Sequence, residues 1–177
     1  VAVLCLAGVF GTSWFVDAQE PTPAPPLEKE MDPPAAPEAT KAPPVIPATT
    51  PAEVTVYCLS YNARGGKCTP VYIRVGGRAQ NLVRVGFFES EVGGSGAMWR
   101  SAGWSAALIA AQLSDFDPRS MQVSFDIEGL IDGPSAGGLM TVGVLAAVRG
   151  DKVREDAAMT GTINPDGTIG PVGGIPY

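Results

Sequence analysis

Residues 132–138 read DGPSAGG and lead directly into the apolar run LMTVGVLAAV at 139–148. This stretch predicts a sharp turn followed by a buried helix. We expect the helix to begin near Pro134, because the missing N–H of proline costs nothing in a first helical turn. Asp132 is well placed to cap the unpaired amides of that turn. An alternating stretch at 121–129 predicts the strand that enters the turn.

Ser135 is the candidate nucleophile. Its expected place at a helix N-terminus would bring free backbone N–H groups and the positive end of the helix dipole near its hydroxyl. Such a setting suits a developing oxyanion, and the small neighbours leave room for a substrate backbone. On these residues alone, two alternatives stay open. One is an ordinary helix cap; the other is a phosphate loop, although the Gly-Lys-Ser/Thr ending of a Walker A motif is absent here and at 92–96.

The segment DGPSAG (132–137) resembles the sequence around the nucleophilic serine of the Lon peptidase family. Two further motifs follow in the family's order and spacing, VREDAAMTG at 153–161 and PVGGI at 171–175. Between them NPDG at 164–167 supplies a turn. The close resemblance runs from Asp132 to Ile175, and upstream the order of elements is similar in outline.

The resemblance implies an α/β (α+β) fold, the Lon proteolytic domain in its ribosomal protein S5 domain 2-like arrangement. It also implies a Ser–Lys dyad with Ser135 as the nucleophile. Thr160 matches a hydroxyl near the dyad lysine, and Asp132 matches an acidic residue beside the nucleophile. The lysine must be neutral to accept the serine proton, so its usual pKa of ~10.4 has to be lowered by desolvation.

The family's dyad lysine lies three residues after the isoleucine matched by Ile175, one position past Tyr177. We expect the complete gene product to continue with lysine there, and the 177 residues by themselves to lack the base. Two other lysines fall in the same region. Lys67 is expected in an exposed hairpin turn and Lys152 beyond the end of the Ser135 helix, so neither is expected to be the base.

The amino-acid composition excludes several catalytic mechanisms and metal sites. The chain has no histidine, which excludes Ser-His-Asp and Cys-His mechanisms and His-ligated metals among these residues. Three scattered cysteines do not form a Cys₄ zinc site, and we expect no cofactor or metal. The chain carries a net charge of −6, and from residue 54 onward its charges nearly balance without a basic stripe, so nucleic acid is not an expected partner.

The N-terminal third differs in composition from the rest. Residues 1–18 (VAVLCLAGVFGTSWFVDA) are uncharged up to Asp17 and predict a signal peptide, with a membrane anchor as the alternative. Residues 19–53 hold eleven of the seventeen prolines, which predicts a disordered linker. Residues 54–177 form the predicted proteolytic domain. The expected location is extracytoplasmic, either secreted, periplasmic or tethered to a membrane.

The first part of that domain reads as strands and one helix. Runs at 54–61 and 70–75, joined by ARGGKC, predict a hairpin, and 81–88 predicts a third strand. Ala-rich residues 98–113 predict a packed helix. In an exported domain Cys58 and Cys68 would form a disulfide across the hairpin, with two unpaired thiols as the alternative.

Taken together, these features predict a serine endopeptidase that needs no ATP and cleaves unfolded or flexible protein segments. Protein or peptide substrates are its expected partners, and a homo-oligomer is compatible with the sequence. A catalytically inactive Lon-like domain that binds peptides or acts as a scaffold is the first alternative. Nucleotide binding by the Gly-rich turns is the second.

Overall fold

The structure is a computed structural model that describes residues 51–62, 65–77 and 82–175. The predicted signal peptide or anchor at 1–18, and all but the last residues of the predicted linker, lie outside the described residues. Within the described part, no helix is long and apolar enough to cross a membrane.

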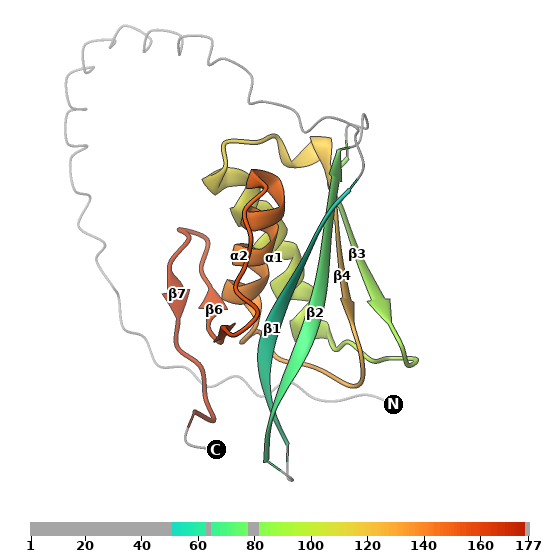
Figure 1. The fold of residues 1–177 in the computed structure, drawn as a ribbon, viewed down its shortest axis with the longest axis vertical. Coiled ribbons are helices and arrows are strands. Elements are labelled where there is room, and N and C mark those ends of the chain that lie inside the picture. Colours follow the sequence, from blue (N-terminus) through green and yellow to red (C-terminus); the bar gives the residue numbers. More distant parts are fainter. Residues whose placement is uncertain (1–50, 63–64, 78–81, 176–177) are drawn as a thin grey trace, which may run out of the picture. The chain divides into compact units, whose positions relative to one another are not determined.

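The described residues form a mixed α/β fold in which a five-stranded sheet is covered on one face by two helices (Figure 1). The strand order is β3-β4-β2-β1-β5. β2 pairs antiparallel with β1 and β4, whereas β3 runs parallel to β4 and β5 parallel to β1. The bounds are β1 Ala52–Asn62, β2 Gly65–Gly77, β3 Arg84–Glu89, α1 Ala97–Leu113, a 3-10 turn at Pro118–Ser120, β4 Met121–Ile127, α2 Gly137–Arg149, β5 Ala158–Met159, β6 Thr162–Ile163 and β7 Ile169–Gly170.

Alternation along the strands sends one set of apolar side chains toward the helices, as period-2 geometry requires. The core between sheet and helices is built from large side chains that are almost fully buried, among them Val56, Ile73, Trp99, Phe125 and Met140. α2 can approach the sheet closely because it carries Gly143 at the crossing. A Cβ there would overlap the side chain of Ile73 and lie 3.2 Å from Val56 Cγ1.

The expected hairpin is present, but its strands are longer than the apolar runs predict. Asn62 pairs with Gly65, so most of the ARGGKC connection belongs to strand β2. Lys67 therefore lies in β2 opposite Ser60 and not in a turn, although it is exposed as expected. The third strand begins at Arg84, three residues later than predicted, and β4 ends at Ile127, two residues earlier. The helix predicted at 98–113 is confirmed as α1.

The predicted disulfide between Cys58 and Cys68 is wrong, since both thiols are free. In the hairpin register Cys58 faces Thr69 and Cys68 faces Leu59. Neighbouring residues of a strand point to opposite faces, so the two thiols are on opposite sides of the sheet and cannot meet. Cys58 is packed in the core at 1% exposure, and Cys68 is exposed.

The C-terminal segment returns along α2 and ends in a second, two-stranded sheet. β6 and β7 form the predicted strand pair around NPDG. Gly167 takes a φ of +83° and its N–H donates to the Asn164 carbonyl at 2.9 Å, which closes the turn as the sequence predicts.

Candidate active site

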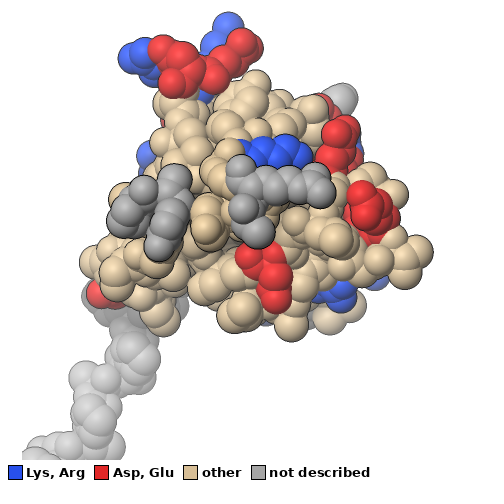
Figure 2. Space-filling model, turned by 90° about the horizontal axis from the view of Figure 1, so that it is seen from below, with Lys and Arg blue, Asp and Glu red and all other residues tan. Residues whose placement is uncertain are grey.

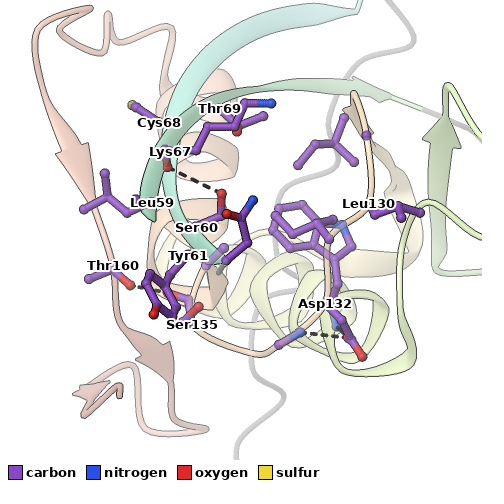
Figure 3. A pocket seen from close by; sticks show the side chains of 18 of the residues that line it. Leu59, Ser60, Tyr61, Lys67, Cys68, Thr69, Leu130, Asp132, Ser135 and Thr160 are labelled. Carbon is purple, nitrogen blue, oxygen red and sulfur yellow. Dashed lines mark hydrogen bonds between the residues drawn. The ribbon is translucent and has the colours of Figure 1, made fainter. Parts of the chain in front are cut away.

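β3 and β4 finish at the end of the sheet where the β1–β2 hairpin projects (Figure 1). Residues from these segments line a pocket of about 900 Å³. Its lining comes from the hairpin, the loop after β3, Trp99 of α1, the connection from β4 to α2, Thr160, and residues 173–175. Ser135, Asp132 and Thr160, the three site residues predicted from the sequence, all line this one pocket (Figure 3).

Ser135 is half-buried in the turn between β4 and α2. The predicted helix start near Pro134 is wrong, because α2 begins at Gly137. The residues before it form a turn in which the Gly137 N–H donates to the Pro134 carbonyl at 3.0 Å. Within the part of the chain that the structure describes, the Ser135 hydroxyl has no hydrogen-bond partner, which leaves it available for chemistry in the pocket.

The backbone amides around Ser135 are only partly available. The N–H groups of Gly137 and Gly138 are used, by the Pro134 carbonyl and by the Gly161 carbonyl (2.9 Å) respectively. The N–H groups of Ser135 and Ala136 have no backbone acceptor among the described residues. These two amides are therefore the donors that remain for an oxyanion formed at Ser135.

Thr160, which was predicted to lie near the dyad lysine, is hydrogen-bonded to the backbone of Ser135. Its hydroxyl donates to the backbone carbonyl of Ser135 at 3.3 Å (Figure 3), and the Gly161 N–H donates to the same carbonyl at 2.7 Å. The segment after β5 thus holds the backbone of the Ser135 turn in place. The predicted contact of Thr160 with a lysine amine involves no residue of the described chain and stays a prediction.

Asp132 caps a helix, but not the predicted one. Its carboxylate accepts hydrogen bonds from the Trp99 N–H at 3.1 Å and the Gly133 N–H at 2.7 Å, so it caps α1 and not α2. Bonds from the Gly133, Trp99 and Met98 backbones hold the pKa of Asp132 below its ordinary value. Gly96 makes this contact sterically feasible, because a Cβ at that position would overlap the Asp132 carboxyl group.

A polar cluster that sequence reasoning missed fixes the loop between β3 and α1. The Glu89 carboxylate accepts hydrogen bonds from the Ser95 hydroxyl, from the Gly94 N–H at 3.1 Å and from Arg100 at 3.1 Å. These bonds, the Ser95 hydroxyl first, lower the pKa of Glu89. Ser95 is buried, and its N-terminal neighbour Gly94 accepts from the Ile131 N–H at 2.7 Å. The Glu89 cluster is thereby connected to the chain that carries Asp132 and Ser135.

The structure also shows which charged side chains line the pocket and which do not. Lys67 lines the pocket, whereas Lys152 lies exposed beyond α2 and does not. Glu91 and Glu128 line it as well and were not singled out in the sequence. Glu91 follows the strand predicted at 81–88, and Glu128 falls near the end of the strand predicted at 121–129, which are weak signals. In the described residues no group of His, Cys, Asp and Glu side chains is arranged to hold a metal ion.

Comparison with known proteins identifies the family that this site resembles. Residues 106–176 match the Lon protease (S16) C-terminal proteolytic domain. A segment of 44 residues is 54% identical to Lon protease 1 of Sorangium cellulosum, and it covers 25% of this chain and 5% of that protein. Over 63 residues the chain is 41% identical to the Lon protease of Paraburkholderia phytofirmans, which is 35% of this chain and 8% of the relative.

These matches confirm the resemblance inferred from DGPSAG and its companion motifs, and the mixed α/β fold is consistent with it. The family match begins at residue 106, inside α1, well upstream of Asp132. The matched segments span less than a tenth of the length of the relatives.

Proposed function

Since residues 106–176 belong to the Lon proteolytic-domain family, we propose that this chain is part of a serine endopeptidase in which Ser135 attacks the peptide carbonyl. The observation that carries the proposal is the state of Ser135. Its hydroxyl lines a pocket of about 900 Å³ and has no partner among the described residues, and its own N–H and that of Ala136 are free to receive an oxyanion.

The base of the proposed mechanism is a lysine three residues after Ile175 in the complete gene product. Its neutral amine takes the proton of the Ser135 hydroxyl as the oxygen bonds to the substrate carbonyl carbon. The proton then passes to the leaving amine, and the acyl-enzyme is hydrolysed by water. The bonds from Thr160 and Gly161 to the Ser135 carbonyl support this role by fixing the nucleophile's backbone.

The proposed substrates are unfolded or flexible protein segments. Along the outer edge of β1 only Tyr57 and Cys58 pair with β5, and the residues that follow, Leu59–Asn62, line the pocket. An extended chain can lie beside the edge of such a strand, whereas a folded domain presents no free strand to it. No Walker A motif occurs in the 177 residues, and we propose that cleavage needs no ATP.

The proposed location is outside the cytoplasm, based on the apolar run at 1–18 and the Pro-rich stretch at 19–53. Cell fractionation of the complete gene product tests this, and recovery only in the cytoplasmic fraction would contradict it.

Replacement of Ser135 by Ala in the complete gene product tests the proposed chemistry. Cleavage of a fluorogenic peptide and of unfolded casein is expected to fall to background, while the thermal unfolding temperature stays near that of the wild type. Addition of ATP should leave the wild-type rate unchanged. Wild-type turnover in Ser135→Ala would overturn the mechanism, and peptide binding without any cleavage by the wild type would favour the scaffold alternative.

A further inference from the structure

The wall of the pocket formed by the loops after β3 and β4 carries two carboxylates that the proposed mechanism does not use. Glu91 and Glu128 line the pocket, both are exposed, and neither side chain forms a hydrogen bond or ion pair within the described residues. The other glutamate of this region, Glu89, is already satisfied by Ser95, Gly94 and Arg100. Glu91 and Glu128 are therefore the acidic groups of this wall that are free to meet a ligand.

The backbone places the two glutamates on adjoining loops. Strands β3 and β4 run parallel and end in register, with Glu89 opposite Ile127. Just beyond, the Gly129 N–H donates to the Ser90 hydroxyl at 3.1 Å. Glu91 is the neighbour of Ser90 and Glu128 the neighbour of Gly129, so the two glutamates flank one hydrogen bond on adjoining loops.

The same wall offers apolar surface and an unused donor. Leu130 lines the pocket and is 76% exposed, which is a high exposure for a leucine. Trp99 also lines the pocket and is only 1% exposed, and its indole N–H has no hydrogen-bond partner in the described residues. A buried tryptophan N–H normally has an acceptor, so this unpaired donor beneath the pocket wall is an exception.

Charge is distributed unevenly around the pocket. Lys67 is its one basic lining residue in the described chain, and it comes from β2, whereas Glu91 and Glu128 come from the loops after β3 and β4. In Figure 3 Lys67 lies with Cys68 and Thr69 on the hairpin side of the pocket, away from Leu130 and Asp132. Seen from below, this end of the molecule has acidic and basic side chains interspersed over a larger uncharged surface (Figure 2).

Asp132 leaves the charge on the loop side of the pocket negative. Its carboxylate is occupied by the Trp99 and Gly133 N–H groups, and its lowered pKa keeps it ionised, so it adds negative charge to the same side. Hence the loop side of the pocket carries carboxylates beside exposed leucine. That combination suits a side chain with an aliphatic stem and a cationic head, which is lysine or arginine.

We propose that Glu91 and Glu128 select a basic side chain of the substrate. The aliphatic stem of that side chain packs along Leu130, while the neighbouring substrate residues reach Ser135. The proposal rests on the proposed peptidase function and specifies the substrate class of that site. Two solvent-exposed carboxylates give a preference of modest size, about twofold to fivefold for each. The preference weakens as salt is added, because exposed charges are screened within ~8 Å at physiological ionic strength.

The test uses the complete gene product and three fluorogenic peptide sets that differ only in one residue, Lys, Gln or Glu, moved through the positions around the cleaved bond. At one position the wild type is expected to have a higher kcat/KM for Lys than for Glu. Glu91→Gln and Glu128→Gln should each lower that Lys-to-Glu ratio about twofold to fivefold, and the double variant should bring it near one. Lys67→Gln should raise the ratio, because it removes the charge that attracts Glu.

Glu155→Gln is the matched control, since Glu155 is an exposed glutamate that does not line the pocket. Its Lys-to-Glu ratio should equal that of the wild type. Equal rates on the Lys and Glu peptides at every position, or a ratio untouched by Glu128→Gln and Glu91→Gln together, would overturn the inference while Ser135-dependent cleavage still supports the peptidase.

A binding measurement distinguishes the proposed substrate preference from the proposed peptidase activity. The Ser135→Ala protein is titrated with the labelled Lys, Gln and Glu peptides, and fluorescence anisotropy gives the affinity for each. A preference for Lys that Glu91→Gln and Glu128→Gln abolish supports the inference even if no peptide is cleaved. Equal binding of the three peptides contradicts it.

Discussion

The Asp132 carboxylate accepts a hydrogen bond from the backbone N–H of Trp99 at 3.1 Å, across 33 positions of sequence. The residue three positions before the candidate nucleophile is thus fixed to the N-terminus of α1. The negative charge also faces the positive end of that helix, which favours it. Movement of α1 relative to the turn would therefore displace the chain that carries Ser135.

Asp132→Asn should weaken this connection in a pH-dependent way. The folded state lowers the Asp132 pKa, so the carboxylate contributes stability that is complete above the unfolded-state aspartate pKa of ~3.9 and is lost as pH falls through the lower folded-state value. Thermal unfolding measured from pH 7 down to pH 2 should show the two proteins converging at the acid end. Asp151→Asn, an exposed aspartate outside the pocket, is the control, and a difference that persists at pH 2 would contradict the assignment.

Thr160→Val should lower kcat/KM about twofold to tenfold, because a hydrogen bond to the Ser135 carbonyl contributes roughly 0.5–1.5 kcal/mol and valine keeps the shape without the donor. Thr160→Ser retains the hydroxyl and should recover most of the activity. Steady-state kinetics on one peptide substrate decides this. If the Ser variant is as impaired as the Val variant, the methyl packing of Thr160 matters and the hydroxyl does not.

The two cysteines of the hairpin should differ sharply in reactivity. Burial raises the pKa of Cys58 to about 11, so at pH 7.5 its thiolate fraction is less than about a hundredth of that of an ordinary cysteine. Iodoacetamide should label Cys68 in the native protein and Cys58 only after unfolding. Peptide mapping by mass spectrometry reads this out, and a peptide pair linked by a disulfide would contradict the free thiols of the structure.

Gly143→Ala should destabilise the domain although alanine is the better helix former. The added methyl overlaps Ile73 and approaches Val56 Cγ1 to 3.2 Å, and overpacking of this kind costs about 1–3 kcal/mol. Urea unfolding monitored by tryptophan fluorescence measures the change. Gly173→Ala is the matched control, because a Cβ there meets no atom within 4 Å, and equal stability of the two variants would show that α2 can shift away from the sheet.

The sequence by itself was enough to infer the resemblance to the Lon proteolytic domain, the mixed α/β class and the three predicted residues that line one pocket. Local signals suffice for these, because the run after Gly138 is long and apolar and NPDG can only be a turn between short strands. The same signals placed α1 within one residue of its observed start. Motif spacing was equally informative, since DGPSAG, VREDAAMTG and PVGGI specify one domain type without reference to distant contacts.

Only the tertiary structure decided which groups those residues bind. Asp132 was expected to cap the next helix but caps α1, since a carboxylate bonds whichever amides the packing brings to it. Cys58 and Cys68 were expected to pair, but the hairpin register sets them on opposite faces of the sheet. Glu91 and Glu128 belong to no sequence motif. They are recognised as pocket residues only from the structure, in which the parallel pairing of β3 and β4 brings their two loops to the same side of the pocket. Partner choice depends on contacts between residues far apart in the chain, and no local pattern encodes those contacts.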